Sequence, residues 1–147
     1  MSWKISLMVL LTGTLIPIQA GVNGALARKT GSPMFAATVS FLIGTVFLLA
    51  IIPMVSGAIP KMADVRETPW WVWSGGLVGA AYVVLVIMAV QKVGASTLIV
   101  FVVAGQMIAS LIIDHYGLIG FPQVEITVKR MAGALLLIGG VLMIRSS

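Results

Sequence analysis

The chain has 147 residues, of which 60% are hydrophobic and 9% are charged, and its mean hydropathy is +1.14. Soluble domains carry about 25% charged residues, so this composition excludes a soluble globular fold and indicates an integral membrane protein. The formal net charge of +5 comes from basic residues that stand singly or in pairs between apolar runs, which fits lipid headgroups and argues against nucleic acid as a partner. Because the chain has no cysteine and one histidine, we expect no metal site and no cofactor.

Five stretches are apolar and long enough to cross a bilayer, for which a helix needs about 20 residues. They cover residues 5–26, 33–55, 70–90, 95–113 and 128–144. Short polar connections lie between them, at residues 27–32, 56–69, 91–94 and 115–127. Ser32 can cap a second helix that begins at Pro33, and Gly94 is suited to ending the third. The sequence therefore predicts an all-α protein with one transmembrane domain over residues 1–147.

The first predicted helix follows Lys4, as the core of a signal peptide would. Residues 5–27 are too long for such a core, however, and Pro17, Gln19 and Asn23 lie inside them. Pro17 cannot donate a backbone hydrogen bond, so it should kink the helix. Gln19 and Asn23 are four residues apart on one face beside this kink, which is how many transporters build a substrate site. The alternative is that both amides hydrogen-bond neighbouring helices.

The second and third predicted helices each carry a polar group in apolar surroundings. Ser40 can line the same site, or its hydroxyl can bond a carbonyl of its own helix. The hydroxyl of Tyr82 needs a partner in hydrocarbon, so we expect this side chain to face the same interior as Gln106.

The fourth predicted helix has the most unusual polar pattern. Gln106, Ser110 and Asp114 follow one another at intervals of four residues, which places them on one helix face. An unpaired amide costs free energy in the core of a bilayer, so this face should turn toward protein or toward a cavity. A structural glutamine that only joins two helices is the alternative.

Asp114 and His115 close this helix and are candidates for coupling or gating. Asp114 should lie at the membrane interface, where it can pair with Lys129 or Arg130, and we favour this ion pair over a role in proton coupling. His115 has no evident nucleophile partner, so the sequence does not predict an enzyme.

The basic residues divide almost evenly between the two membrane faces. With five spans, one face holds Lys4, Lys61, Arg66, Lys129 and Arg130, and the other holds Arg28, Lys29, Lys92 and Arg145. Orientation normally follows an excess of Lys and Arg in the cytoplasmic loops, so five against four permits insertion in both orientations. The alternative is one orientation, set by the first helix or by the lipid composition.

The interfacial aromatic residues all map to the face with five basic residues. They are Trp3, Trp70, Trp71, Trp73, Tyr116 and Phe121. Aromatic belts normally form at both faces of a membrane, so an antiparallel pair of chains would complete the second belt.

Several motifs resemble those of the YdcZ-like proteins. They are Pro17–Gly24, Pro69–Trp71, Trp73–Gly76, Gly79–Val83, Val103–Gln106, Ser110–Gly117, Arg130 with Gly133, and Gly139–Val141. The motif in the fourth helix is specific, whereas the glycine patterns alone would be weak. The resemblance covers nearly the whole chain.

This resemblance implies a small member of the drug/metabolite transporter superfamily, a multi-pass protein of the bacterial cytoplasmic (inner) membrane. Many relatives in that superfamily carry ten helices as two inverted five-helix repeats. The resemblance therefore implies that two oppositely inserted copies of this chain rebuild a ten-helix body. The small multidrug-resistance relatives carry an acid in the middle of the first helix, where this chain has Gln19 and Asn23, so proton-for-cation antiport by that mechanism is not expected.

These observations together predict a secondary-type transporter or exporter of a small neutral or amphipathic solute. It would work by alternating access as an antiparallel homodimer. Its substrate site would be polar but uncharged, and would be lined by Gln19, Asn23, Ser40, Tyr82, Gln106 and Ser110. A passive channel of the same architecture and an accessory membrane subunit without flux are the alternatives. The substrate, its direction of transport, the coupling ion and pairing with a related chain stay open.

Overall fold

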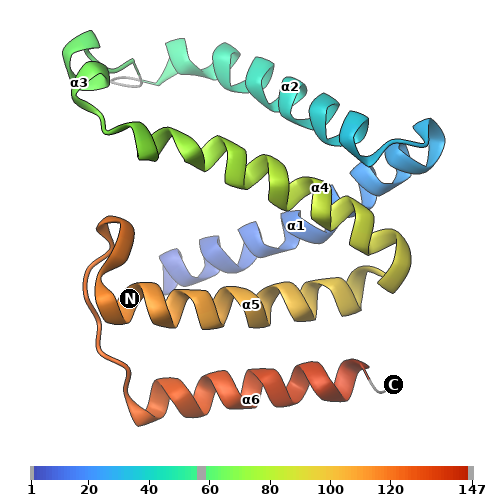
Figure 1. The fold of residues 1–147 in the computed structure, drawn as a ribbon, viewed down its shortest axis with the longest axis vertical. Helices are drawn as coiled ribbons and strands as arrows, with labels where there is room; N and C mark the ends of the chain where they lie inside the picture. The colour runs from blue at the N-terminus through green and yellow to red at the C-terminus, as the bar shows by residue number, and fades with distance from the viewer. Residues whose placement is uncertain (1, 56–58, 146–147) are drawn as a thin grey trace. The chain divides into compact units, whose positions relative to one another are not determined.

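The structure is a computed structural model that describes residues 2–55 and 59–145, and Figure 1 shows that it is built from helices. In chain order these are α1 (Trp3–Thr30), α2 (Pro33–Ile51), η1 (Ile52–Met54), α3 (Met62–Glu67), η2 (Trp70–Ser74), α4 (Gly75–Val93), α5 (Ala95–Tyr116), η3 (Leu118–Gly120) and α6 (Val128–Arg145). No strand occurs within the described ranges, which confirms the all-α prediction.

Four helices in the described part of the chain are long and apolar enough to cross a membrane. They are Trp3–Thr30, Pro33–Met54, Trp70–Val93 and Ala95–Tyr116. Helix α6 is not one of these four, because its 18 residues include Lys129, Arg130 and Arg145. The predicted helix at 128–144 is therefore present, and its role as a fifth span stays a prediction.

The helices extend beyond the apolar stretches that predicted them. Helix α1 runs to Thr30 rather than to residue 26, and α5 runs to Tyr116 rather than to residue 113. Polar side chains end an apolar run but leave the backbone hydrogen bonds of a helix intact. Both helices end instead where a glycine adopts positive φ, at Gly31 (φ 70°) and Gly117 (φ 60°). The predicted turn at 27–32 is thus reduced to Gly31 and Ser32.

The predicted cap of the second helix is confirmed. The Ser32 hydroxyl oxygen accepts a hydrogen bond from the backbone N–H of Phe35 at 3.2 Å, and Pro33 occupies the first turn of α2. This cap satisfies one of the backbone donors that a helix N-terminus leaves free, and it fixes where the chain reverses direction.

The turn predicted at 91–94 is likewise reduced to Gly94, and the two longer predicted loops also differ from the structure. The surface loop predicted at 56–69 contains the short helix α3, while residues 56–58 of that loop lie outside the described ranges. The interfacial loop predicted from residue 115 begins only after Tyr116, with η3 followed by an extended segment that leads to α6. Short polar helices such as α3 carry no apolar periodicity, which is why hydropathy alone misses them.

The chain divides into two compact units, Met1–Lys92 and Val93–Ser147. In the first unit α1 and α2 form a close hairpin lined by small residues, and side chains of α4 pack against it. The central cluster consists of Ala27, Ala36, Ala37, Val83 and Ile87. In the second unit α5 and α6 pack along each other. The prediction of one transmembrane domain over the whole chain stays a prediction.

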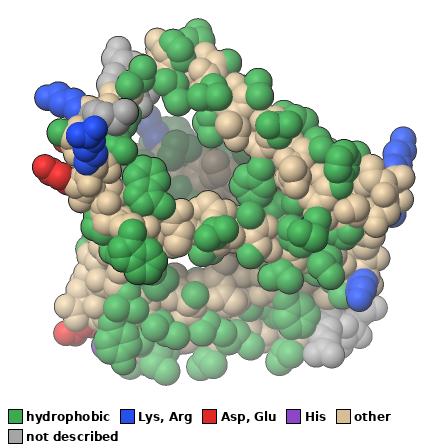
Figure 2. Space-filling view, turned by 45° about the horizontal axis from the view of Figure 1, so that its top comes forward, with side chains coloured by type: hydrophobic (Ala, Val, Ile, Leu, Met, Phe, Trp, Pro, Cys, Tyr) green, Lys and Arg blue, Asp and Glu red, His purple; other side chains and the backbone are tan. Residues whose placement is uncertain are grey.

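Burial in the first unit is concentrated at one end of its helices. The buried residues in its described part lie between Ala20 and Ala37 and between Val83 and Ile87, near the turn that joins α1 to α2. Toward α3 the helices are exposed, and Figure 2 shows the surface hollowed between α2 and α4. The first unit is thus packed at the end with the α1–α2 turn and open toward α3.

Candidate functional site

Three of the predicted site residues meet between α1 and α2. The Nδ2 group of Asn23 donates a hydrogen bond to the Ser40 hydroxyl at 3.3 Å. Asn23 is only 6% exposed, because it lies among Ala20, Gly24 and Ala27 on the buried face of α1. The Ser40 hydroxyl thus contacts the neighbouring helix, whereas the sequence analysis considered a place in the site or a bond to a carbonyl of its own helix.

Gln19 lies one turn before Asn23 and is exposed. Together with Ser40 it borders a groove of about 250 Å³, which is otherwise lined by Phe41, Gly44, Thr45 and Leu48. On the other side Gln19, Asn23 and Ser40 border a second, mostly apolar groove of about 430 Å³. No hydrogen bond within the described part of the chain reaches the Gln19 carboxamide. This amide is therefore available to a ligand or to a partner chain.

The Thr45 hydroxyl in the first groove is already engaged. It donates to the Phe41 carbonyl of its own helix at 2.8 Å. Neither groove is lined by a charged residue. The donors and acceptors that a ligand could reach are therefore those of the Gln19 amide and those that Asn23 and Ser40 do not use in bonding each other.

Tyr82 lies on α4 and packs against the central cluster of the first unit. Its hydroxyl is buried, and it has no hydrogen-bond partner within the described ranges. The partner that the sequence led us to expect is thus absent from this part of the structure. Tyr82 also does not line either groove beside Gln19.

The predicted polar face of α5 belongs to the second unit. Gln106 and Ser110 are exposed, and the Ser110 hydroxyl donates to the Met107 carbonyl of its own helix at 2.9 Å. A common site for Gln106, Ser110 and the groove of the first unit therefore stays a prediction.

The expected ion pair forms at the end of α5. The Arg130 guanidinium contacts the Asp114 carboxylate, with the two side chains 33% and 24% exposed. The same guanidinium donates to the Val124 carbonyl at 3.3 Å, and the Val124 N–H donates to the Asp114 carbonyl at 2.8 Å. Of the two basic partners that the sequence allowed, the structure selects Arg130.

His115 lies beside this ion pair but takes no part in it. Its carbonyl accepts a hydrogen bond from the Gln123 amide at 3.1 Å, and its ring contacts that of Tyr116 edge to face. Its Nδ1 atom is buried without a partner within the described ranges. The Gln123 contact holds the segment after α5 against the helix through the His115 backbone, and a coupling or gating role for the His115 side chain stays a prediction.

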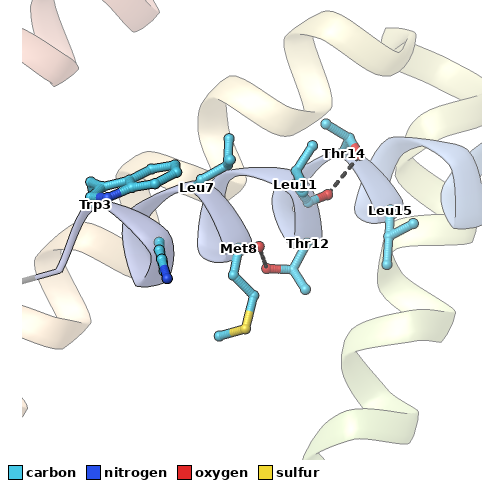
Figure 3. Close-up of a pocket in the computed structure, with 8 residues that line it drawn as sticks. Trp3, Leu7, Met8, Leu11, Thr12, Thr14 and Leu15 are labelled. Carbon is cyan, nitrogen blue, oxygen red and sulfur yellow. Dashed lines mark hydrogen bonds between the residues drawn. The ribbon is translucent and has the colours of Figure 1, made fainter.

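The first half of α1 borders a hollow that sequence reasoning missed. Its volume is about 620 Å³. Figure 3 shows the residues that border it, among them Trp3, Leu7, Met8, Leu11 and Leu15, all of them on α1. The Thr12 hydroxyl donates to the Met8 and Val9 carbonyls, and the Thr14 hydroxyl donates to the Leu11 carbonyl. The polar groups of both threonines are thus satisfied inside the helix, as hydrocarbon surroundings require. Thr12, which shares a face with Gln19, does not extend the polar site.

Comparison with known proteins agrees with this membrane architecture. The chain matches the family described as "Putative inner membrane exporter, YdcZ" over residues 5–143. It is 26% identical to the inner membrane protein YdcZ of Escherichia coli (strain K12) over 132 residues, which cover 90% of this chain and 88% of that protein. No solved structure matches.

The match covers all four apolar helices and most of α6. It supports a multi-pass protein of the inner membrane with a transport function rather than an enzyme. The chain belongs to the YdcZ family of inner membrane proteins.

Proposed function

We propose that this protein exports a small neutral or amphipathic solute by alternating access, as an antiparallel homodimer. The observation that carries this proposal is the groove beside Gln19. Within an apolar helix pair, Gln19 offers a carboxamide without a partner next to the Asn23–Ser40 hydrogen bond. Leaving such a group unpaired in hydrocarbon costs about 1–3 kcal/mol, so a ligand that pairs with it gains affinity.

The absence of charge around the grooves supports a neutral solute. The residues that line both grooves carry amide, hydroxyl and apolar groups. A cation would lose its hydration there without gaining a carboxylate, which is unfavourable in a medium of low dielectric constant. A molecule with an apolar body and one hydrogen-bonding group fits this lining.

We propose α6 as the fifth span. Its uncharged stretch, residues 131–144, holds 14 residues and is about 21 Å long at 1.5 Å per residue. This is shorter than the hydrocarbon core of about 30 Å, but basic residues flank it at both ends. Long basic side chains reach the headgroups, and a bilayer thins locally around a short span at modest cost.

An odd number of spans places the two ends of a chain on opposite sides of the membrane. The balanced basic residues, with the aromatic residues at one face, favour two oppositely inserted copies. In that assembly the site beside Gln19 would occur twice, and rocking of one copy against the other would expose it alternately to the two sides.

The test is counterflow of a neutral amphipathic solute in proteoliposomes, using a compound that the wild-type protein transports. Gln19→Leu and Gln106→Leu should each lower the rate at least tenfold and leave the dimer intact. Gln91→Leu is the matched control, because Gln91 is exposed near the end of α4 and should transport normally. Flux that rises linearly without saturation or counterflow would indicate a channel instead. Loss of the dimer in both variants would make the two glutamines structural.

A further inference from the structure

Charge is unevenly distributed along the first unit. Its two acidic residues, Asp64 and Glu67, both lie on α3, where Lys61 and Arg66 balance them. At the opposite end Arg28, Lys29 and Lys92 stand without any acidic residue. Figure 2 shows this difference, since blue side chains at the end with the α1–α2 turn have no red neighbours. One membrane face of this unit is therefore purely cationic.

Packing holds the three cations at the same face. Arg28 and Lys29 lie in the last turn of α1, and Lys92 lies in the last turn of α4. The two helices touch just before these turns, where a Cβ placed on Gly24 would lie 3.2 Å from Val90 Cγ1. The cations thus extend from two helix ends that are fixed against each other.

The Arg28 side chain takes the usual direction of a long helical side chain, back toward the N-terminus of α1. A Cβ placed on Gly24 would lie 3.6 Å from its Nη1 atom, so the guanidinium folds back along α1 by about one turn. One turn is about 5.4 Å, so the charge lies nearer the middle of α1 than its own Cα does. Within the described ranges the ion pair is that of Asp114 with Arg130, so Arg28, Lys29 and Lys92 have no acidic partner.

Attraction to the helix C-termini explains only part of why these three cations lie at the same end of the unit. Cations in the last turn of a helix do interact favourably with its C-terminus. Within the described ranges, however, no hydrogen bond joins the Arg28 guanidinium to the C-terminal carbonyls of α1. A guanidinium without an acidic partner at a membrane surface can bind the oxygens of a lipid phosphate in a bidentate manner.

We propose that Arg28, Lys29 and Lys92 form a binding surface for the phosphates of anionic phospholipids. Arg28 holds one phosphate beside Gly24, and the two lysines attract the negative headgroups around it. Each basic residue near an anionic surface strengthens binding about fivefold, so the three together account for on the order of a hundredfold preference over zwitterionic lipid. This surface does not depend on whether the protein transports a solute.

The test compares binding of phosphatidylglycerol and phosphatidylcholine to the purified full chain, by native mass spectrometry and by the rise in melting temperature. The triple variant Arg28→Gln/Lys29→Gln/Lys92→Gln should lose the preference for phosphatidylglycerol. The matched control is Lys4→Gln/Lys61→Gln/Arg66→Gln, which removes the same charge from the other face and should keep the preference. Equal loss in both variants, or retention in both, would overturn the proposal.

Arg28→Lys provides a second test that does not rely on the triple variant folding. It keeps the charge but loses bidentate contact, so it should bind phosphatidylglycerol several-fold more weakly than the wild type, while Lys92→Arg should bind at least as well as the wild type. Unchanged affinity in Arg28→Lys would contradict the assigned phosphate position. Excess inorganic phosphate should not displace the lipid, and displacement would identify a site for free phosphate instead.

Discussion

Asn23 is the residue that most clearly connects packing with function in this protein. It is buried on α1, yet its amide is not left unpaired, because Ser40 on the neighbouring helix accepts from it. The pair therefore stabilises the hairpin and also presents polar groups beside Gln19. Asn23 can therefore join two helices by a hydrogen bond and also border a substrate site.

Ser40→Ala should reduce the stability of the protein by about 0.6 kcal/mol, which is the average for hydrogen bonds between membrane helices. Reversible unfolding in mixed micelles measures this change. Thr38→Ala is the control, since the Thr38 hydroxyl bonds the Met34 carbonyl of its own helix at 2.9 Å. If both variants lose the same stability, the Asn23–Ser40 contact has no special role.

Asp114→Asn should lower stability by on the order of 1 kcal/mol, because Arg130 would lose its carboxylate partner in a half-buried position. The pH profile of transport should not change, since the carboxylate is engaged in a structural ion pair. Measuring the transport rate against pH for the wild type and for Asp114→Asn distinguishes a structural ion pair from proton coupling. A profile that becomes flat in the variant would show that Asp114 couples proton movement to transport.

The residue types in the site were predictable, but their partners were only partly so. The hairpin connection makes contact between α1 and α2 unavoidable, so Asn23 and Ser40 could be assigned to one site from the sequence. Tyr82 was expected to find a partner, but its buried hydroxyl has none in the described part of the chain. A sequence records that a group is polar, whereas its partner depends on side-chain positions that only packing determines.

At the scale of the helices, small residues decide which surfaces can meet. Gly24 of α1 lies so close to Val90 of α4 that an added Cβ would be only 3.2 Å from the valine methyl. At Gly21, one turn earlier on the same helix, an added Cβ would meet nothing within 4 Å. The sequence alone does not distinguish the two glycines, but only Gly24 packs against a neighbouring helix.

Gly24→Val should destabilise the protein by about 1–3 kcal/mol, because the larger side chain forces α1 and α4 apart. Gly21→Val changes the same residue type on an open face and should cost much less. Thermal unfolding of the two variants in the same detergent measures the difference. Equal melting temperatures would contradict the close contact between α1 and α4.

Helix α6 should cross the membrane although its apolar stretch is short. A chain with Glu125→Cys and Ser146→Cys places one thiol before and one after α6, and the natural chain has no cysteine. An impermeant thiol reagent applied to intact cells should then modify exactly one cysteine per accessible chain, whichever way that chain is inserted. Intact-mass analysis counts the labels. Chains with two labels or none would show that α6 lies on one side.

Hydropathy located the apolar helices well but did not locate their ends. The α1 helix continues through Arg28 and Lys29 because backbone hydrogen bonds do not require apolar side chains. Its end is set by Gly31, whose positive φ an L side chain rarely adopts. Apolar length thus marks the membrane boundary, and glycine marks the end of the helix.

At the scale of the whole molecule, the proposed transport depends on how the chain is inserted. One unit presents a neutral groove and a cationic face, and the other holds the second polar face on α5. The sequence of one chain does not determine how its two units and a second copy assemble, because assembly depends on the surfaces that pack between copies. Opposite insertion of two copies is the arrangement that the balanced basic residues favour.

The most direct test of this claim is a measurement of topology with single cysteines at opposite ends of α2. Thr30→Cys and Ala63→Cys place a thiol at exposed positions on either side of that span. Intact cells are labelled with an impermeant thiol reagent, and the remaining thiols are labelled after permeabilisation. We predict that about half of the chains react from outside at each position. Full labelling at one position and none at the other would contradict the antiparallel homodimer.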